Sequence, residues 1–323
     1  ASPIADPALT YVARHGAGYS RFETTGRGIA IKLLEFVPLK DAIKISRLRI
    51  ANTTKQARRL SLTHFADWSL GQFRTSAAPY VVTDVDTATR GFYASNSSNG
   101  DVRDQVVFLD MKGQQQSWTG DRREFLGRNF AKHAPAALLR EEPLSGRTGP
   151  GFDPCGAQQT EIVLAPGEEK EIVLLLGWGP NRNDAQALLK KYRDADLDTA
   201  FADVKNYWDE TLGALQIKTP DPEMDVLVNR WLLYQTLSCR IWGRAGFYQA
   251  SGAYGFRDQL QDGMALTHAR PAIVREHLLR AASRQFPEGD VQHWWLPENG
   301  KGIRSRISDD KSWPAYVAAQ YVE

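Results

Sequence analysis

The sequence predicts a multidomain protein with a β-rich N-terminal part and a helical C-terminal part. Its 323 residues exceed the usual length of one domain. Up to about residue 180, short runs of alternating apolar residues are separated by polar loops, which is typical of a β-sandwich. From about Asn181 the apolar residues recur every three or four positions, which indicates helices. We therefore expect a β-sandwich domain over 1–180, a helical linker over 181–221 and a helical domain over 222–323.

The strands of the N-terminal part are predicted from apolar runs at 28–39, 42–50, 59–68 and 105–110. Within the second run, Ile43 and Ile45 fall on one face of the strand, while Leu48 and Ile50 fall on the other. A bulge or a twist would bring these residues to one face, so we expect one there.

A tight turn is predicted at Ala165–Glu168, between the apolar runs 162–164 and 172–176. Pro166 fixes φ and Gly167 permits a positive φ, which are the two requirements of such a turn. We expect the two runs to pair as a β-hairpin.

Helices are predicted over 183–195 and 197–215 from their apolar periodicity. Asp221 followed by Pro222 is a helix start, with the aspartate as N-cap, and another helix begins at Pro271. Cys239 falls on the apolar face of the helix after Asp221, so we expect a buried, inert thiol.

Composition excludes several classes of function. The 40 basic and 38 acidic residues are well mixed, which argues against a nucleic-acid partner. No apolar run reaches the roughly 18 residues that span a bilayer. The two cysteines, Cys155 and Cys239, lie far apart, so we expect no disulfide framework and, weakly, a reducing compartment. Without a CxxC or HExxH motif, we predict no metal site.

The segment from Gly243 to Asp310 interleaves glycines, aromatics, carboxylates, arginines and a histidine without a simple period. Such a mixture is poorly suited to a plain core and favours a polar cleft with aromatic walls. Clefts of this kind suit sugars, because aromatic faces stack on a pyranose while carboxylates and guanidinium groups bind its hydroxyls.

Three clusters within this segment are candidates for that cleft. Arg257, Asp258 and Asp262 place two carboxylates four residues apart, which is unfavourable on a helix unless a cation or a hydroxyl-rich ligand binds. A solvated helix start, with the acidic residues near the positive end of the dipole, explains the same spacing.

The second cluster holds Gln292, His293, Trp294 and Trp295, and adjacent tryptophans point in different directions. One of them can therefore pack in the core while the other lines a cleft, and His293 alone is more often structural than catalytic. The third cluster holds Arg304, Asp309 and Asp310, of which one aspartate would suffice as a helix cap.

These clusters and their surroundings resemble the glycoside phosphorylases of the cellobiose and chitobiose phosphorylase family, and more closely the C-terminal part of cyclic β-1,2-glucan synthases. The resemblance is carried by 242–262, 284–297 and 302–310, and by 15–23 and 47–68 in the β region. It implies a supersandwich-like N-terminal β-sandwich, a helical linker and an (α/α)6 barrel, of which 222–323 is an N-terminal, truncated part.

The resemblance also implies an activity. In the family, inorganic phosphate attacks a β-glucosidic bond with inversion, and a single aspartic acid protonates the leaving oxygen. That acid lies in a Trp-Asn-Asp motif further along the barrel, and the motif does not occur in this sequence. We therefore expect a fragment that is inactive alone, with phosphate as co-substrate of the full-length protein and no other cofactor.

The same resemblance assigns the candidate residues. Arg257 and Asp258 would contact the sugar on the non-reducing side of the cleaved bond, and Trp294 would line the cleft. The remaining candidates would build or brace it: Asp262, Gln292, His293, Arg304, Asp309 and Asp310. Two departures from the family pattern are Leu296, where histidine is usual, and Lys311–Trp313, where a Leu-Leu-Trp-like run is usual.

The expected partners are a β-glucan oligosaccharide and either the remainder of the polypeptide or a second copy of the chain. We expect a cytoplasmic location, as the soluble part of an inner-membrane protein. Two other functions fit the same architecture: an inverting glycoside hydrolase, which needs a second carboxylate to activate water, and a non-catalytic glycan-binding module.

Overall fold

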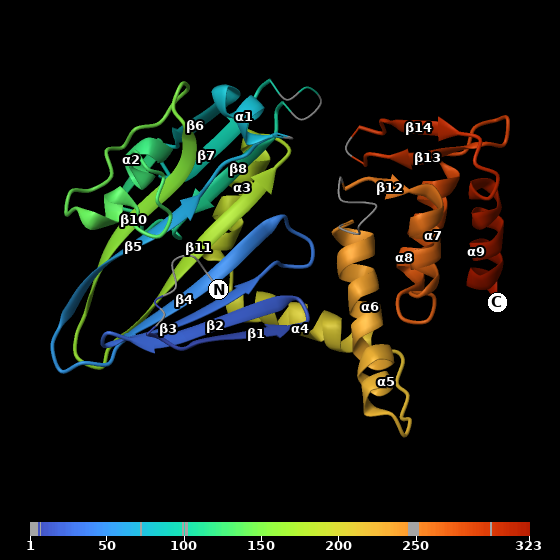
Figure 1. Cartoon of the computed structure of the whole chain (residues 1–323), viewed down its shortest axis with the longest axis horizontal. Coiled ribbons are helices and arrows are strands. Elements are labelled where there is room, and N and C mark those ends of the chain that lie inside the picture. The colour runs from blue at the N-terminus through green and yellow to red at the C-terminus, as the bar shows by residue number, and fades with distance from the viewer. Residues whose placement is uncertain are drawn as a thin grey trace. The chain divides into compact units, whose positions relative to one another are not determined.

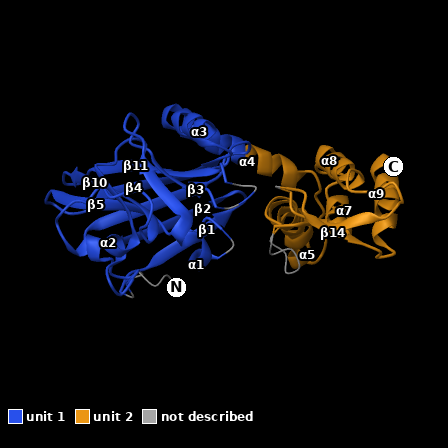
Figure 2. Ribbon diagram, turned by 90° about the horizontal axis from the view of Figure 1, so that it is seen from above, with its two compact units in different colours: residues 1–204 blue, residues 205–323 orange. Residues whose placement is uncertain are grey.

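The computed structural model describes residues 6, 8–71, 73–98, 100, 103–244, 252–297 and 299–323. The chain divides into two compact units, Ala1–Val204 and Lys205–Glu323, which Figure 2 distinguishes by colour.

Unit 1 is built on two antiparallel sheets in its described part (Figure 1). The larger sheet has eight strands in the order β1-β2-β3-β4-β11-β8-β7-β6. These strands are β1 (Tyr11–Gly16), β2 (Tyr19–Gly26), β3 (Ile29–Phe36), β4 (Ile43–Asn52), β6 (Val81–Val85), β7 (Phe92–Asn96), β8 (Val106–Asp110) and β11 (Glu169–Gly179). The smaller sheet contains β5 (Arg58–Ala66), β10 (Pro154–Leu164) and β9 (Ser117–Asp121), in that order.

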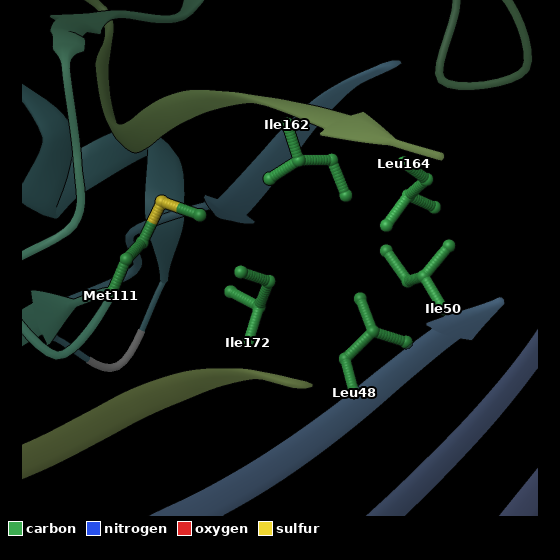
Figure 3. Packing of buried hydrophobic residues seen from close by; sticks show 6 residues of the cluster. All are labelled: Leu48, Ile50, Met111, Ile162, Leu164 and Ile172. Carbon is green, nitrogen blue, oxygen red and sulfur yellow. The ribbon is translucent and has the colours of Figure 1, made fainter. Parts of the chain in front are cut away.

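The two sheets pack face to face across an apolar core. In Figure 3, Leu48 and Ile50 of β4 point toward Ile162 and Leu164 of β10, with Met111 and Ile172 beside them. All six side chains are buried. The predicted β-sandwich is therefore confirmed, and its interior is the space between β4 and β10.

Of the two distortions predicted for β4, a bulge or a twist, the bulge is wrong. Its pairing with β3 and with β11 is continuous, so Ile43 and Ile45 do face away from the inter-sheet core. They are nevertheless 1% and 0% exposed, because a helix covers that outer face of the sheet. Phe36, the cross-strand partner of Ile45, packs on Phe201 of α4 (Leu197–Gly213) with ring centroids 5.2 Å apart. A strand buried on both faces needs no change of register.

The predicted turn forms, but the predicted hairpin does not. The backbone N–H of Glu168 donates to the carbonyl of Ala165 at 3.0 Å, and Gly167 has a φ of 73°. However, β10 pairs with β5 and β9, whereas β11 pairs with β4 and β8. The turn is thus an arch that carries the chain from one sheet to the other, because both runs contribute to the core between the sheets.

Helices and short helical turns complete unit 1. The helix α3 (Arg182–Asp194) is capped by Asn181, whose side chain accepts from the N–H of Asp184. It runs along β11 and β8, and α4 follows it. The shorter elements are α1 (Arg74–Ala77), η1 (Ala78–Tyr80), α2 (Arg122–Leu126) and η3 (Ala136–Leu139).

Unit 2 contains helices and a small sheet. A long helical segment comprises α5 (Pro222–Val226), η4 (Leu227–Trp231), α6 (Leu232–Gln235) and η5 (Thr236–Trp242), of which η4 and η5 are π-helical. The other helices are α7 (Phe256–Met264), α8 (Pro271–Ala282), η6 (Asp310–Ser312) and α9 (Trp313–Val322). The sheet has the order β12 (Tyr254–Gly255), β13 (Val291–Trp295), β14 (Gly302–Ser305).

The helix starts predicted at Asp221 and Pro271 are confirmed. The Asp221 side chain accepts from the N–H groups of Glu223 and Met224, which are otherwise without partners at a helix start. The expectation for Cys239 is wrong, since its side chain is exposed. Other apolar side chains of the helical segment 222–242 are also exposed, such as Trp231 at 50%. The apolar pattern of this segment therefore does not identify a single buried face.

Candidate functional site

The small sheet of unit 2 separates the candidate residues by the face onto which they project. Trp294 of β13 pairs directly with Gly255 of β12 and with Ile303 of β14. Residues directly opposite each other project to the same side of a sheet. We call this side the Trp294 face, and the opposite side, onto which Tyr254 and Trp295 project, the Trp295 face.

Asp258 lies on the Trp294 face. A Cβ atom at Gly255 would lie 2.0 Å from Oδ2 of Asp258, so the carboxylate occupies the space where a side chain of residue 255 would stand. Asp258 is in the first turn of α7, and Gly255 is the N-cap residue of that helix. The start of α7 and the absence of a side chain at Gly255 together place the Asp258 carboxylate next to Trp294 of the neighbouring strand.

The two adjacent tryptophans have different environments, as expected. Trp295 is 1% exposed and packs on Tyr254, with ring centroids 5.6 Å apart. Trp294 is half-buried on the other face, where it retains accessible surface. Trp295 is therefore the core anchor of the pair.

A β-bulge at His293 changes the alternation of side chains along β13. The register shifts between Gln292, which pairs with Arg304, and Trp294, which pairs with Ile303. Because Ile303 and Arg304 are successive residues of β14, their side chains point to opposite faces. Bulges of this kind re-aim side chains and are frequent beside functional sites.

Gln292 and Arg304 consequently lie on the Trp295 face. Nε2 of Gln292 donates to the carbonyl of Gly300 at 3.0 Å. The guanidinium of Arg304 binds both carboxylate oxygens of Asp290 at 2.6 Å, and also Glu288 at 2.9 Å. The structure therefore does not bring these two predicted site residues together with Asp258.

Two side-chain pairs tie the segment around η6 to the rest of the site. Nη1 of Arg257 donates to Oδ2 of Asp309 at 2.6 Å, and this hydrogen bond lowers the pKa of Asp309. Nδ1 of His293 lies 2.8 Å from Oδ2 of Asp310, which is fully buried. The other oxygen of Asp310 has no partner among the described residues. Within the described ranges it is a buried acceptor to which no group donates.

Asp262 lies one helical turn beyond Asp258, and Arg240 of η5 contacts it. Nε of Arg240 donates to Oδ2 of Asp262 at 2.8 Å. Burial raises the pKa of Asp262, and the charge of Asp258 acts in the same direction. The sequence analysis did not identify Arg240 as the cation beside this carboxylate. The available signal was an arginine close to the buried residues Leu237 and Ile241, since a charge near the core needs a partner.

The described candidate residues include hydrogen-bonding groups and an aromatic surface. Within the described ranges, no group of three or more His, Cys, Asp or Glu side chains is placed to hold a metal ion. Asp258 is an acceptor, Arg257 is a donor, and Trp294 supplies a flat apolar surface. Residues 245–251, part of the predicted site segment, lie outside the described residues.

The fold class is a β-sandwich followed by a helical region of the (α/α)6 type, as predicted. A crystal structure of a bacterial glucoamylase complexed with acarbose has the same fold, with a TM-score of 0.63 and 10% sequence identity. The match covers 98% of this chain and 47% of that chain. At this identity the likeness concerns the fold alone.

Residues 1–195 match the family described as "Glycosyl hydrolase 94, supersandwich domain", and residues 207–321 match "Glycosyl hydrolase 94 superfamily, catalytic domain". The chain belongs to glycosyl hydrolase family 94. This confirms the resemblance drawn from the sequence motifs.

Two curated relatives illustrate the range of the family. The chain is 40% identical over 308 residues to the cyclic beta-(1,2)-glucan synthase NdvB of Rhizobium meliloti (strain 1021), covering 95% of this chain and 11% of the relative. It is 28% identical over 345 residues to the N,N'-diacetylchitobiose phosphorylase of Vibrio proteolyticus, covering 97% of this chain and 43% of the relative. The chain thus spans less than half the length of each. None of the described helices is both long and apolar enough to cross a membrane.

Proposed function

We propose that this chain is the glucan-holding part of a protein that processes β-1,2-linked glucan with inorganic phosphate. In this proposal the Trp294 face binds the sugar on the non-reducing side of the cleaved bond. The observation that carries it is the position of Asp258, whose carboxylate fills the space left by Gly255 beside Trp294. The glucan is suggested by the relative that is 40% identical, a cyclic beta-(1,2)-glucan synthase.

Each candidate residue would have a role suited to its chemistry. The Trp294 indole would stack on the apolar side of a glucose ring, and Asp258 would accept hydrogen bonds from its hydroxyls. Arg257, fixed by Asp309, would donate to a ring substituent. His293, held by Asp310, would present its other ring nitrogen to the ligand.

The chemical step requires more than these residues supply. We propose that phosphate is the co-substrate of the full-length protein, that no organic cofactor or metal takes part, and that the protein works in the cytoplasm. Phosphorolysis needs a proton donor for the leaving oxygen. The Trp-Asn-Asp motif that would hold it is absent from this sequence, so the chain alone should bind glucan without cleaving it.

Isothermal titration of linear β-1,2-glucan oligosaccharides into the chain tests the binding part. Asp258→Asn should weaken binding at least about tenfold, because hydrogen bonds to a charged group contribute roughly 1.5–3 kcal/mol. Asp209→Asn is the matched control. Its carboxylate is 66% exposed in the same unit and lies 3.8 Å from Arg230, so this variant should bind like the wild type.

Two results would contradict the proposal. Equal binding by wild type and Asp258→Asn would place the glucan elsewhere, for example on the β-sandwich. Cleavage of glucan by the full-length protein at an unchanged rate without phosphate would identify an inverting hydrolase instead.

A further inference from the structure

The Trp295 face carries guanidinium groups on two adjacent aromatic rings. Arg244 and Arg280 lie over the ring of Tyr254, at 4.8 and 5.1 Å from its centroid. Arg284 lies over Trp295, at 5.4 Å. Since the two ring centroids are 5.6 Å apart, the three guanidinium groups are gathered around one aromatic pair. A group of positive charges attracts an anion.

Arg284 is the member of this group whose donors are least satisfied. Arg280 is paired with Glu276. By contrast, Nε of Arg284 is buried away from water and has no acceptor among the described residues. Its guanidinium forms no hydrogen bond or ion pair with any other residue in the ranges that the structure describes. Buried donors without partners are rare in native proteins and indicate a ligand, an ion or a water.

The surrounding chain holds the Arg284 guanidinium in place. Gly300 has a φ of 70°, and a Cβ atom there would lie 2.9 Å from Nη1 of Arg284. Gln292 connects the two residues, since its backbone N–H donates to the Arg284 carbonyl and its Nε2 donates to the Gly300 carbonyl, both at 3.0 Å. The fork of donors is therefore preorganised before any acceptor arrives.

We propose that Arg284 is the centre of an oxyanion site on the Trp295 face, and that its ligand is inorganic phosphate. The planar guanidinium matches two oxygens of a phosphate, and the dianion is attracted by the positive charge of the arginines around the aromatic pair. A neutral sugar hydroxyl would satisfy the donors but not the charge. The site lies on the opposite side of the small sheet from Asp258, so it does not depend on the proposed glucan site.

Phosphate titrated into the chain at constant ionic strength, with sodium chloride as the balancing salt, tests this site by calorimetry and by thermal unfolding. We expect one phosphate per chain and a higher Tm in phosphate. Arg284→Met keeps the apolar stem on Trp295 and should bind phosphate at least about tenfold more weakly. Arg275→Met, an exposed arginine of α8, is the control and should bind normally.

Further variants separate this site from a folding defect and from the glucan site. Arg284→Lys keeps the charge but loses the fork, and Gly300→Ala displaces Nη1, so both should weaken phosphate binding. Asp258→Asn should leave it unchanged. The proposal is overturned if phosphate stabilises the wild type no more than chloride does. It is also overturned if Arg284→Lys and Gly300→Ala bind like the wild type, or if acetate stabilises as well as phosphate, which would indicate a carboxylate ligand.

Discussion

Gly255 determines where the Asp258 carboxylate stands. Its backbone angles, φ −81° and ψ 132°, are accessible to any residue, so an alanine there would not strain the main chain. The absence of a side chain matters because Oδ2 of Asp258 lies 2.0 Å from the place of its Cβ. The glycine is therefore required by the site and not by the turn.

Gly255→Ala should displace the Asp258 carboxylate and weaken glucan binding several-fold while the chain remains folded. Gly263→Ala is the control within the same helix, since no atom lies within 4 Å of the Cβ it would add. That variant should retain binding and gain up to about 1 kcal/mol of stability from the better helix former. Calorimetric titration and urea unfolding measure the two effects, and equal glucan affinity in both variants would disprove this role of Gly255.

His277 makes stability depend on pH. Its ring is 3% exposed and lies 2.8 Å from Oε1 of Gln259. Burial, together with the charges of Arg280 and Arg244, lowers the pKa of His277 to about 4. The unfolded chain therefore binds a proton at this residue below about pH 6.5, whereas the folded chain does not until about pH 4.

The free energy of unfolding should consequently fall as the pH is lowered from 6.5 to 4, with up to about 1.4 kcal/mol per pH unit from this residue. In His277→Gln the dependence should be shallower by this amount, and in His268→Gln, an exposed position, it should be unchanged. Urea unfolding at a series of pH values provides the measurement. Identical slopes for the wild type and His277→Gln would show that the ring is not buried in its neutral form.

Asn52 hydrogen-bonds to both connections between the two sheets of unit 1. Its side chain is 1% exposed, and Nδ2 donates to the carbonyls of Leu164, Ala165 and Gln56 at 2.7–3.1 Å. Its Oδ1 accepts from the N–H of Thr54 at 3.0 Å. One amide thus satisfies the main-chain groups of both arches, from β4 to β5 and from β10 to β11.

Asn52→Ala should lower the free energy of unfolding by about 2–4 kcal/mol, because several main-chain groups at the two arches lose their partner. Asn206→Ala, at an exposed position of α4, should stay within about 0.5 kcal/mol of the wild type. Chemical denaturation of both variants tests this. A loss below about 1 kcal/mol in Asn52→Ala would mean that the arches hold without the amide.

The same elements show which features of the fold a sequence pattern predicts. Asp221 and Pro271 mark helix starts through local chemistry, so both were predictable. The arch at Ala165–Glu168 has the residues of a hairpin turn. These residues determine the local turn, whereas the choice of partner strand depends on distant parts of the chain. Likewise, apolar residues lie on both faces of β4 because α4 covers the outer face of the sheet. The residues of β4 alone do not reveal this helix.

For the whole molecule, the fold class was predictable from the sequence, but the side of the sheet on which each candidate residue lies was not. Asp258 and Trp294 share a face because of a cross-strand pairing and a missing side chain. The bulge at His293 places Gln292 on the other face, opposite Arg304 of β14, and a shift of one residue has no signature in composition.

A crystal structure of the chain with a linear β-1,2-glucan oligosaccharide would show whether Asp258 and Trp294 form one glucan-binding surface. We predict a glucose ring stacked on the Trp294 indole, with a hydroxyl within hydrogen-bonding distance of the Asp258 carboxylate. An oligosaccharide bound to the β-sandwich or to the Trp295 face, with the Trp294 face empty at saturating concentration, would contradict the account.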